Sequence, residues 1–127
     1  MLITTPISIG ELLDKISILI IKDRNISDAE KQKHINKELL SLYETLDKFI
    51  SREKVKEYIE NLITINSKLW KIEDDIRDCE RNNQFDQKFI NLARSVYFTN
   101  DERSKLKLEI NQKFGSELIE VKSYEKY

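Results

Sequence analysis

The chain has 127 residues, 39% of them hydrophobic and 35% charged, which suits one compact domain spanning residues 1–127. Its 22 lysines and arginines nearly balance 23 aspartates and glutamates, which argues against nucleic acid as the main partner. One cysteine excludes an internal disulfide and fits a reducing cytosol. The most apolar run, residues 16–21, is too short to span a bilayer. We therefore expect a soluble, cytoplasmic protein with no membrane partner.

Two glycines and one proline interrupt the chain, and this scarcity of turn residues favours long helices. Residues 1–7 are expected to be extended, because the β-branched residues 3–5 precede the proline. The capping-box motif SIGE at 8–11 predicts a helix over 9–24. The similar motif SDAE at 27–30 predicts a second helix that ends near Phe49.

The third and fourth helices are predicted from their caps. Ser51 can cap a helix that runs to Arg81. Asp86 can cap another that runs to Phe114 and ends at Gly115, because glycine tolerates the left-handed conformation after a helix. Thr99 and Glu102 could form a further capping box, which would kink or break this helix near Thr99. We favour one continuous helix, because the apolar repeat continues through the segment.

Four helices joined by short turns predict a mainly α protein, an antiparallel four-helix bundle with short extended N- and C-terminal segments. The tail after Gly115 alternates enough to form a short strand, which could pair with residues 2–5. Leftover apolar surface and this strand edge raise a homodimer, or another homo-oligomer, as a hypothesis beside a monomer.

Polar residues interrupt the apolar stripes of the last two helices. Steps of three and four along the third helix include Asn66, Glu73, Arg77 and Glu80, and those along the fourth include Asn100, Arg103, Lys107 and Asn111. Antiparallel packing would bring Glu73 near Tyr97 or Asn100, and Asn66 near Arg103 or Lys107. A buried charge needs a partner, water or a ligand, so these groups must meet one of the three.

Two interpretations are open. The first is a paired network, with Glu73 bound to Arg103 or Arg77 and Glu80 bound to Arg77 or Lys88. The second is a polar, arginine-lined pocket between the helices of a binding or adaptor protein. Its predicted ligand-binding residues are Glu73, Arg77, Arg94, Tyr97, Asn100, Arg103 and Lys107. Because Glu73 can compensate only one cation, we expect residual positive potential and an anionic small molecule such as phosphate or a carboxylate.

A different class of function is a magnesium-dependent enzyme acting on a phosphorylated small molecule. Glu73, Asp74 and Asn100 offer oxygen ligands for Mg²⁺. Glu11 and Asp14 form an E-x-x-D pair similar to those of all-helical nucleotide pyrophosphohydrolases, but the ordered pair of acidic motifs of that family is missing. No catalytic residue is assigned. Without that arrangement the binding protein is the first hypothesis, with no cofactor.

The stretches SIGELLDKISIL, LWKIEDDIR, FINLARSVYFTNDERSKLKLEIN and GSELIEVKSY resemble an uncharacterised family of small bacterial and phage proteins, a domain of unknown function, along nearly the whole chain. The resemblance implies no chemistry. It implies that the following residues belong to the family pattern: Glu11, Asp14, Lys15, Trp70, Glu73, Asp74, Arg77, Arg94, Tyr97, Asn100, Asp101, Arg103, Lys107 and Lys122-Ser123-Tyr124.

Overall fold

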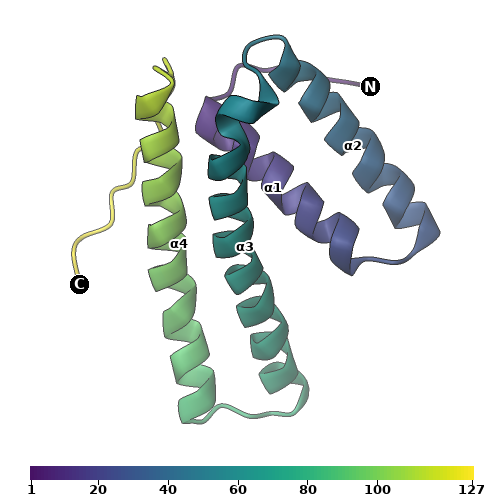
Figure 1. The fold of residues 1–127 in the computed structure, drawn as a ribbon. Helices are drawn as coiled ribbons and strands as arrows, with labels where there is room; N and C mark the ends of the chain where they lie inside the picture. The colour runs from purple at the N-terminus through teal and green to yellow at the C-terminus, as the bar shows by residue number, and fades with distance from the viewer.

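A computed structural model describes residues 1–127, which form four helices and no strand (Figure 1). The helices are α1 (Ile9–Asn25), α2 (Ala29–Asp47), α3 (Arg52–Arg81) and α4 (Gln87–Lys113). The mainly α fold with extended terminal segments is therefore confirmed. No helix combines the length and the apolar character that crossing a membrane would need.

The helices begin close to the predicted positions, although Ser51 and Asp86, at the N-caps of α3 and α4, make no side-chain capping hydrogen bond. Ser8 Oγ accepts a hydrogen bond from the amide of Glu11 at 3.1 Å, as expected for the first helix. The cap of α2 is Asp28, whose Oδ1 accepts from the amide of Lys31 at 2.9 Å, and not Ser27. The helix α4 is continuous, and Gly115 after it has φ +65°, the left-handed conformation predicted there.

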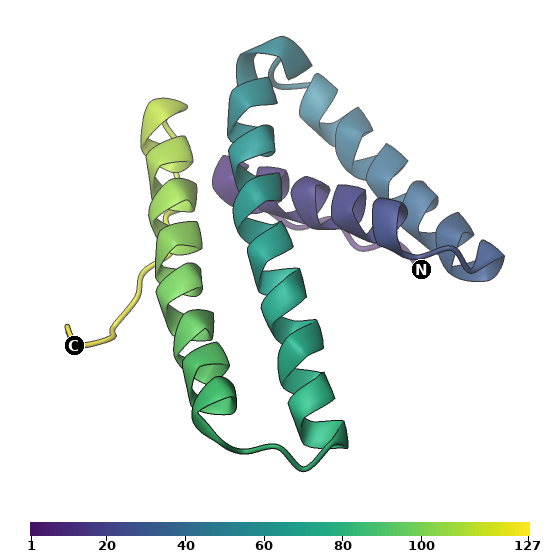
Figure 2. The ribbon, with the colours of Figure 1, turned by 60° about the horizontal axis from the view of Figure 1, so that its bottom comes forward.

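The helix α1 is central, because it packs against each of the other three helices. The helices α3 and α4 form an antiparallel hairpin, and α1 crosses one half of it while α2 packs on α1 (Figure 2). Lys68 of α3 and Glu102 of α4 form an ion pair across the hairpin at 3.7 Å, which agrees with the register expected from the polar stripes. The other half of the hairpin extends beyond α1 and α2 (Figures 1 and 2).

The hydrophobic core lies where α1 crosses the hairpin. Its members are side chains from all four helices, namely Leu12, Leu13, Ile16, Leu46, Val55, Ile59, Leu62, Leu106 and Ile110. The helix α1 supplies Leu13 and Ile16, which are fully buried. This placement explains why α1 is apolar around most of its circumference, since protein surrounds it on several sides.

The predicted pairing of the tail with residues 2–5 is wrong, because neither segment forms a strand. The tail lies beside α4 instead (Figure 1). Glu120 forms an ion pair with Lys107, and the Tyr127 hydroxyl donates a hydrogen bond to Asp101. These polar contacts with α4 replace the strand pairing that the alternating sequence suggested.

Gly10 marks the closest approach of α1 to α4. Its amide donates a hydrogen bond to Asn111 Oδ1 at 2.7 Å, which satisfies one of the free amides in the first turn of α1. A Cβ atom at this position would lie 2.7 Å from the carbonyl oxygen of Lys107 and 2.8 Å from Asn111 Oδ1. Only glycine therefore allows the two helices to meet at this distance.

We expect Gly10→Ala to lower the free energy of unfolding by about 1–3 kcal/mol, because the added methyl group overpacks the contact. This loss should appear although alanine favours helix by about 1 kcal/mol. Urea denaturation measures the change, and Lys15→Ala, exposed on the same helix, is the control. A midpoint for Gly10→Ala equal to or above that of the wild type would contradict the close approach.

Candidate functional site

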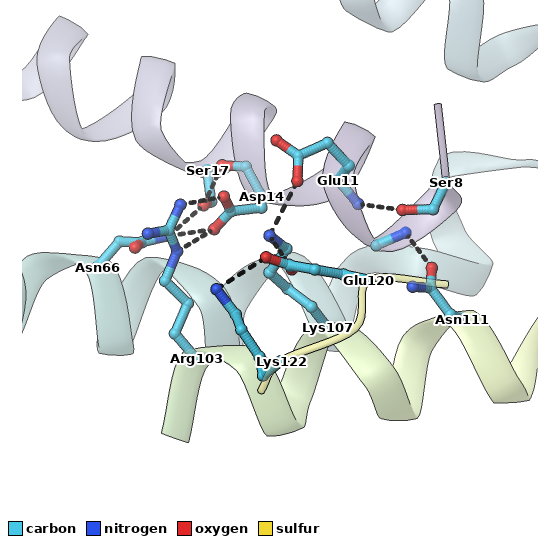
Figure 3. Close-up of polar contacts among 11 residues, drawn as sticks. Ser8, Glu11, Asp14, Ser17, Asn66, Arg103, Lys107, Asn111, Glu120 and Lys122 are labelled. Atoms are coloured by element: carbon cyan, nitrogen blue, oxygen red, sulfur yellow. Dashed lines mark hydrogen bonds and ion pairs between the residues drawn. The ribbon is translucent and has the colours of Figure 1, made fainter. Parts of the chain in front are cut away.

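The carboxylate of Asp14 is the buried centre of the polar contacts between helices (Figure 3). Asp14 lies on the second turn of α1 and is 1% exposed. Arg103 of α4 binds both of its oxygens: Nε donates to Oδ1 at 2.9 Å and Nη2 donates to Oδ2. Asn66 of α3 donates through Nδ2 to Oδ1 at 2.9 Å. One carboxylate therefore joins three helices.

Ser17 completes the surroundings of Asp14. It lies one turn further along α1 and is fully buried. Its Oγ donates to the backbone oxygen of Asp14 at 2.7 Å and accepts from Asn66 Nδ2 at 2.9 Å. No buried side-chain nitrogen or oxygen in the protein is left without a hydrogen-bond partner. This cluster has the saturated hydrogen bonding of a structural network.

A second charged cluster lies one turn away, around Lys107 of α4 (Figure 3). The ammonium of Lys107 lies 2.8 Å from Glu11 Oε2 of α1 and 2.9 Å from Glu120 Oε2 of the tail. The other oxygen of Glu120 lies 2.9 Å from Lys122 Nζ. The Lys107 side chain is 9% exposed and that of Glu120 is 40% exposed. The site therefore has an inner cation and an outer, accessible carboxylate.

These contacts change the pKa values of the groups involved. Burial alone would lower the pKa of Lys107, but its hydrogen bonds to Glu11 and Glu120 outweigh that effect and raise it. Hydrogen bonds from Lys107 and then from Lys122 lower the pKa of Glu120 to about 2. The hydrogen bond to Asp14 raises the pKa of Arg103 against the opposing effect of burial. All these groups are charged near neutral pH.

The expectation that one cation of α4 lacks compensation is wrong. Each cluster is balanced: Asp14 faces Arg103, while Glu11 and Glu120 face Lys107 and Lys122. The compensating carboxylates come from α1 and from the tail, and not from the facing part of α3. Residual positive potential at this place would require that one of these carboxylates leave.

The predicted site residues separate into two groups. Arg103 and Lys107 lie at the contact with α1, whereas Glu73, Arg77, Arg94, Tyr97 and Asn100 lie beyond it and are exposed. Glu73 pairs with Arg77 along α3 at 3.6 Å, which is one of the pairings expected for a network. Arg94 lies over the ring of Phe98, and Tyr97 packs edge to face on Tyr127. The structure does not bring the seven residues into one pocket.

The acidic residues of α3 remain on the surface. Glu73 and Asp74 are exposed, and Glu73 is engaged by Arg77. The structure contains no group of three or more histidine, cysteine, aspartate or glutamate side chains placed to hold a metal ion. The magnesium-dependent enzyme stays a hypothesis, and its predicted ligands Glu73, Asp74 and Asn100 do not belong to any such group.

The polar stripe of the fourth helix included Asn111, but no pattern in the sequence pointed to Ser17 or Glu120 at this site. Glu120 carries no signal of its own, since its partner Lys107 lies on another element and the tail has no regular structure. Gly10 did carry one, because a glycine in the first turn of a helix weakens it unless a close contact requires the residue. Lys122 appeared only through the family resemblance.

Residues 3–127 match the sequence profile of DUF6165, a family of unknown function. The chain belongs to DUF6165. Neither a curated protein nor a solved structure matches the chain. Membership confirms the resemblance found in the sequence. Because the function of the family is unknown, membership assigns no chemistry to this DUF6165 protein.

We expect Asp14→Asn to lower the free energy of unfolding by about 3 kcal/mol, because it leaves the half-buried Arg103 without its carboxylate. The exposed pair of Arg52 and Asp47 has the same bidentate geometry, with both hydrogen bonds at 2.9 Å. Asp47→Asn is thus the matched control and should change stability much less, because solvent screens that pair. Urea denaturation compares the two variants; equal losses would contradict a special role of the buried carboxylate.

The pH dependence of the tail follows from Glu120. Its pKa is lowered from 4.5 to about 2 in the folded protein, so its contribution to docking of the tail is complete above pH 4.5 and is lost as pH falls towards 2. We expect a carboxyl NMR titration of Glu120 to have a midpoint well below 4.5. In Lys107→Met the midpoint should rise towards the ordinary value. A wild-type midpoint at 4.5 would show that the tail does not bind Lys107.

Proposed function

We propose that this protein is a small binding protein that takes up an anionic group, a phosphate or a carboxylate, at Lys107 and Lys122. One observation supports this proposal above the others: a carboxylate, that of Glu120, already lies between these two ammonium groups at 2.9 Å from each. A position that holds one carboxylate at hydrogen-bonding distance has the chemistry to hold another anion. The anionic ligand would exchange with Glu120.

The surroundings of Glu120 favour such an exchange. Its neighbours in the tail, Ile119 and Val121, are 51% and 86% exposed, so apolar packing does little to hold this part of the tail. A pocket of about 350 Å³ lies between the tail and α4, near the lower end of the size range of small-molecule sites. It is lined by Ser104, Lys105, Leu108, Asn111, Glu120 and Lys122, so Lys122 lines it and Lys107 does not. Lys105 adds a further cation to this pocket.

The role of Arg103 in the proposal is indirect. Its guanidinium is occupied by Asp14 and holds α1 against α4. Glu11 of α1 also contacts Lys107, and it stays in place because the core holds α1. When the side chain of Glu120 turns away while the tail stays in place, Lys107 and Lys122 face only Glu11, and the cluster gains one net positive charge.

We expect Glu120→Gln to bind inorganic phosphate at least about tenfold more tightly than the wild type, because the competing carboxylate is gone. An amide-shift NMR titration with phosphate against chloride at matched ionic strength measures the affinity. The variant Glu117→Gln, exposed in the same tail, is the charge-matched control and should behave as the wild type. Lys107→Met in the Glu120→Gln background should abolish the gain. Equal affinities for Glu120→Gln and Glu117→Gln would reject the proposal.

The proposal also names a partner and a compartment. The partner is a second copy of the chain, and the compartment is a reducing cytosol. The accessible surface of the chain is 9338 Å², whereas a compact monomer of 15.1 kDa has about 7100 Å². The extended chain ends contribute to this excess, and so does the half of the α3–α4 hairpin that α1 leaves uncovered. The cytosol is supported by Cys79, a free thiol that is 1% exposed.

A further inference from the structure

The tail runs back beside α4 from the end of that helix (Figure 1). Beyond Ser116, ion pairs, hydrogen bonds and aromatic contacts join it to the helices at two places. Glu120 forms an ion pair with Lys107, and the hydroxyl of Tyr127 donates a hydrogen bond to Asp101. All residues from 117 to 127 are exposed, so apolar packing adds little to these contacts. The position of the tail therefore depends on both of them.

Tyr127 lies on three side chains of α4, Tyr97, Phe98 and Asp101, here called the α4 platform. Steps of three and four residues place these side chains on one face of the helix. The ring of Tyr127 meets that of Tyr97 edge to face, with the centroids 5.4 Å apart. It meets the ring of Phe98 in the same way at 5.1 Å. Such pairs attract each other beyond the area that they bury, so the platform holds a side chain that is 75% exposed.

The hydroxyl of Tyr127 is a stable donor in this contact. Its hydrogen bond to the carboxylate of Asp101 raises the pKa of Tyr127 to about 12. The hydroxyl therefore keeps its proton near neutral pH. A hydrogen bond to a charged acceptor is also stronger than one between neutral groups.

Lys122 lies between the two contacts and has no such contact with a helix. Its ammonium is 2.9 Å from Glu120 Oε1 and 5.8 Å from the ring centre of Tyr124. Both partners belong to the tail itself. Lys122 is therefore close to Lys107 only because the tail is held beside α4.

Uptake of an anion by the proposed site would remove one of the two contacts. Glu120 would no longer bridge the two ammonium groups, and the middle of the tail would lose its ion pair with Lys107. Without a second contact, Lys122 would lie seven residues along a chain attached only at Gly115. Seven extended residues reach about 23 Å, so its ammonium would spend little time near Lys107.

The contact of Tyr127 lies close enough to prevent this loss. Asp101 precedes Lys107 by six residues of α4, which is about 9 Å along the helix. Tyr127 follows Lys122 by five residues. With Tyr127 on the platform, Lys122 belongs to a short loop that is attached to α4 at both ends, and such a loop samples far fewer positions than a free chain.

We propose that Tyr127 is a positioning residue of the anion site, which keeps Lys122 beside Lys107. Tyr127 stays on the α4 platform while an anion takes the place of the Glu120 carboxylate. The inference rests on the proposed function and adds to it the residue on which a site with two cations depends. The tail is thus a strap, attached at its end while its middle exchanges one carboxylate for another anion.

The test measures phosphate affinity in the Glu120→Gln background, where the competing carboxylate and its ion pair with Lys107 are both absent. An amide-shift NMR titration against chloride at matched ionic strength compares Tyr127→Ala with Lys122→Met. We expect each change to weaken binding about two- to fivefold, the contribution of one exposed ion pair. The two changes together should weaken binding no more than Lys122→Met alone, because Tyr127 acts through Lys122.

The controls separate positioning from a general effect on structure. Val121→Ala shortens a tail side chain that is 86% exposed and should leave the affinity unchanged. Tyr127→Phe keeps the ring contacts and should weaken binding less than Tyr127→Ala. Helical circular dichroism should be the same in all variants, because the tail contributes no residue to the core. A general structural effect of Tyr127→Ala would add to that of Lys122→Met.

Backbone motion gives an independent readout without phosphate. The heteronuclear ¹H–¹⁵N NOE of Lys122 reports motion on the picosecond to nanosecond timescale. We expect a value well above that of a free chain end in Glu120→Gln, and a clear fall when Tyr127→Ala is added. Equal values in these two variants would show that Tyr127 does not hold the tail.

The titrations also distinguish this inference from the proposed function. No phosphate binding by Glu120→Gln would reject the proposed function. Binding that Lys122→Met weakens and Tyr127→Ala does not would reject the positioning role alone. Binding that neither change weakens would place the anion at Lys107 without the tail, and would reject the positioning role as well.

Discussion

The arrangement of the protein depends on one buried carboxylate, that of Asp14. Removing a carboxylate from water costs several kcal/mol unless charge and hydrogen bonds compensate it. Here Arg103 of α4 supplies the charge and Asn66 of α3 supplies a further donor. The carboxylate is satisfied only when α1 crosses the hairpin at this height and in this rotation. Apolar packing of Leu13 and Ile16 makes the contact stable, and the polar cluster selects one position for it.

The neighbouring cluster around Lys107 follows a different design. Asp14 and Glu11 belong to α1 and are held by the core, whereas Glu120 belongs to a tail whose side chains are mostly exposed. The ion pairs of Asp14 and Glu11 thus serve the fold, and the pair between Glu120 and Lys107 can break without disturbing it. This difference in attachment, rather than in charge, is what makes Lys107 the better candidate for ligand binding than Arg103. A function that begins when an anion displaces the side chain of Glu120 would leave in place both the bundle and the part of the tail that carries Lys122.

Local signals in the sequence were sufficient for the helices and for the register of α3 against α4. Capping residues, the scarcity of glycine and the apolar repeat are properties of neighbouring residues, and a short turn forces antiparallel packing. The partners of Arg103 and Lys107 could not be predicted in this way. They lie on α1, about 90 residues earlier in the chain, and on a tail without periodicity. Their positions depend on where α1 crosses the hairpin, which is decided by packing and not by any one element. Glu73 was the natural partner to expect within the hairpin, and Arg77 on its own helix binds it instead.

The polar interruptions of the apolar stripes have two different physical origins. Near α1, Asn66 and Arg103 are polar because they meet a carboxylate inside the same chain. Beyond α1, Asn100 and the pair formed by Glu73 and Arg77 continue the same faces but meet no other helix of the chain. A purely apolar stripe exposed there would favour unspecific aggregation, whereas polar groups among apolar ones restrict binding to a partner with matching charges. The pattern that looks like a defective core in the sequence is therefore, in this half of the hairpin, a partly solvated surface on which polar groups limit unspecific contact.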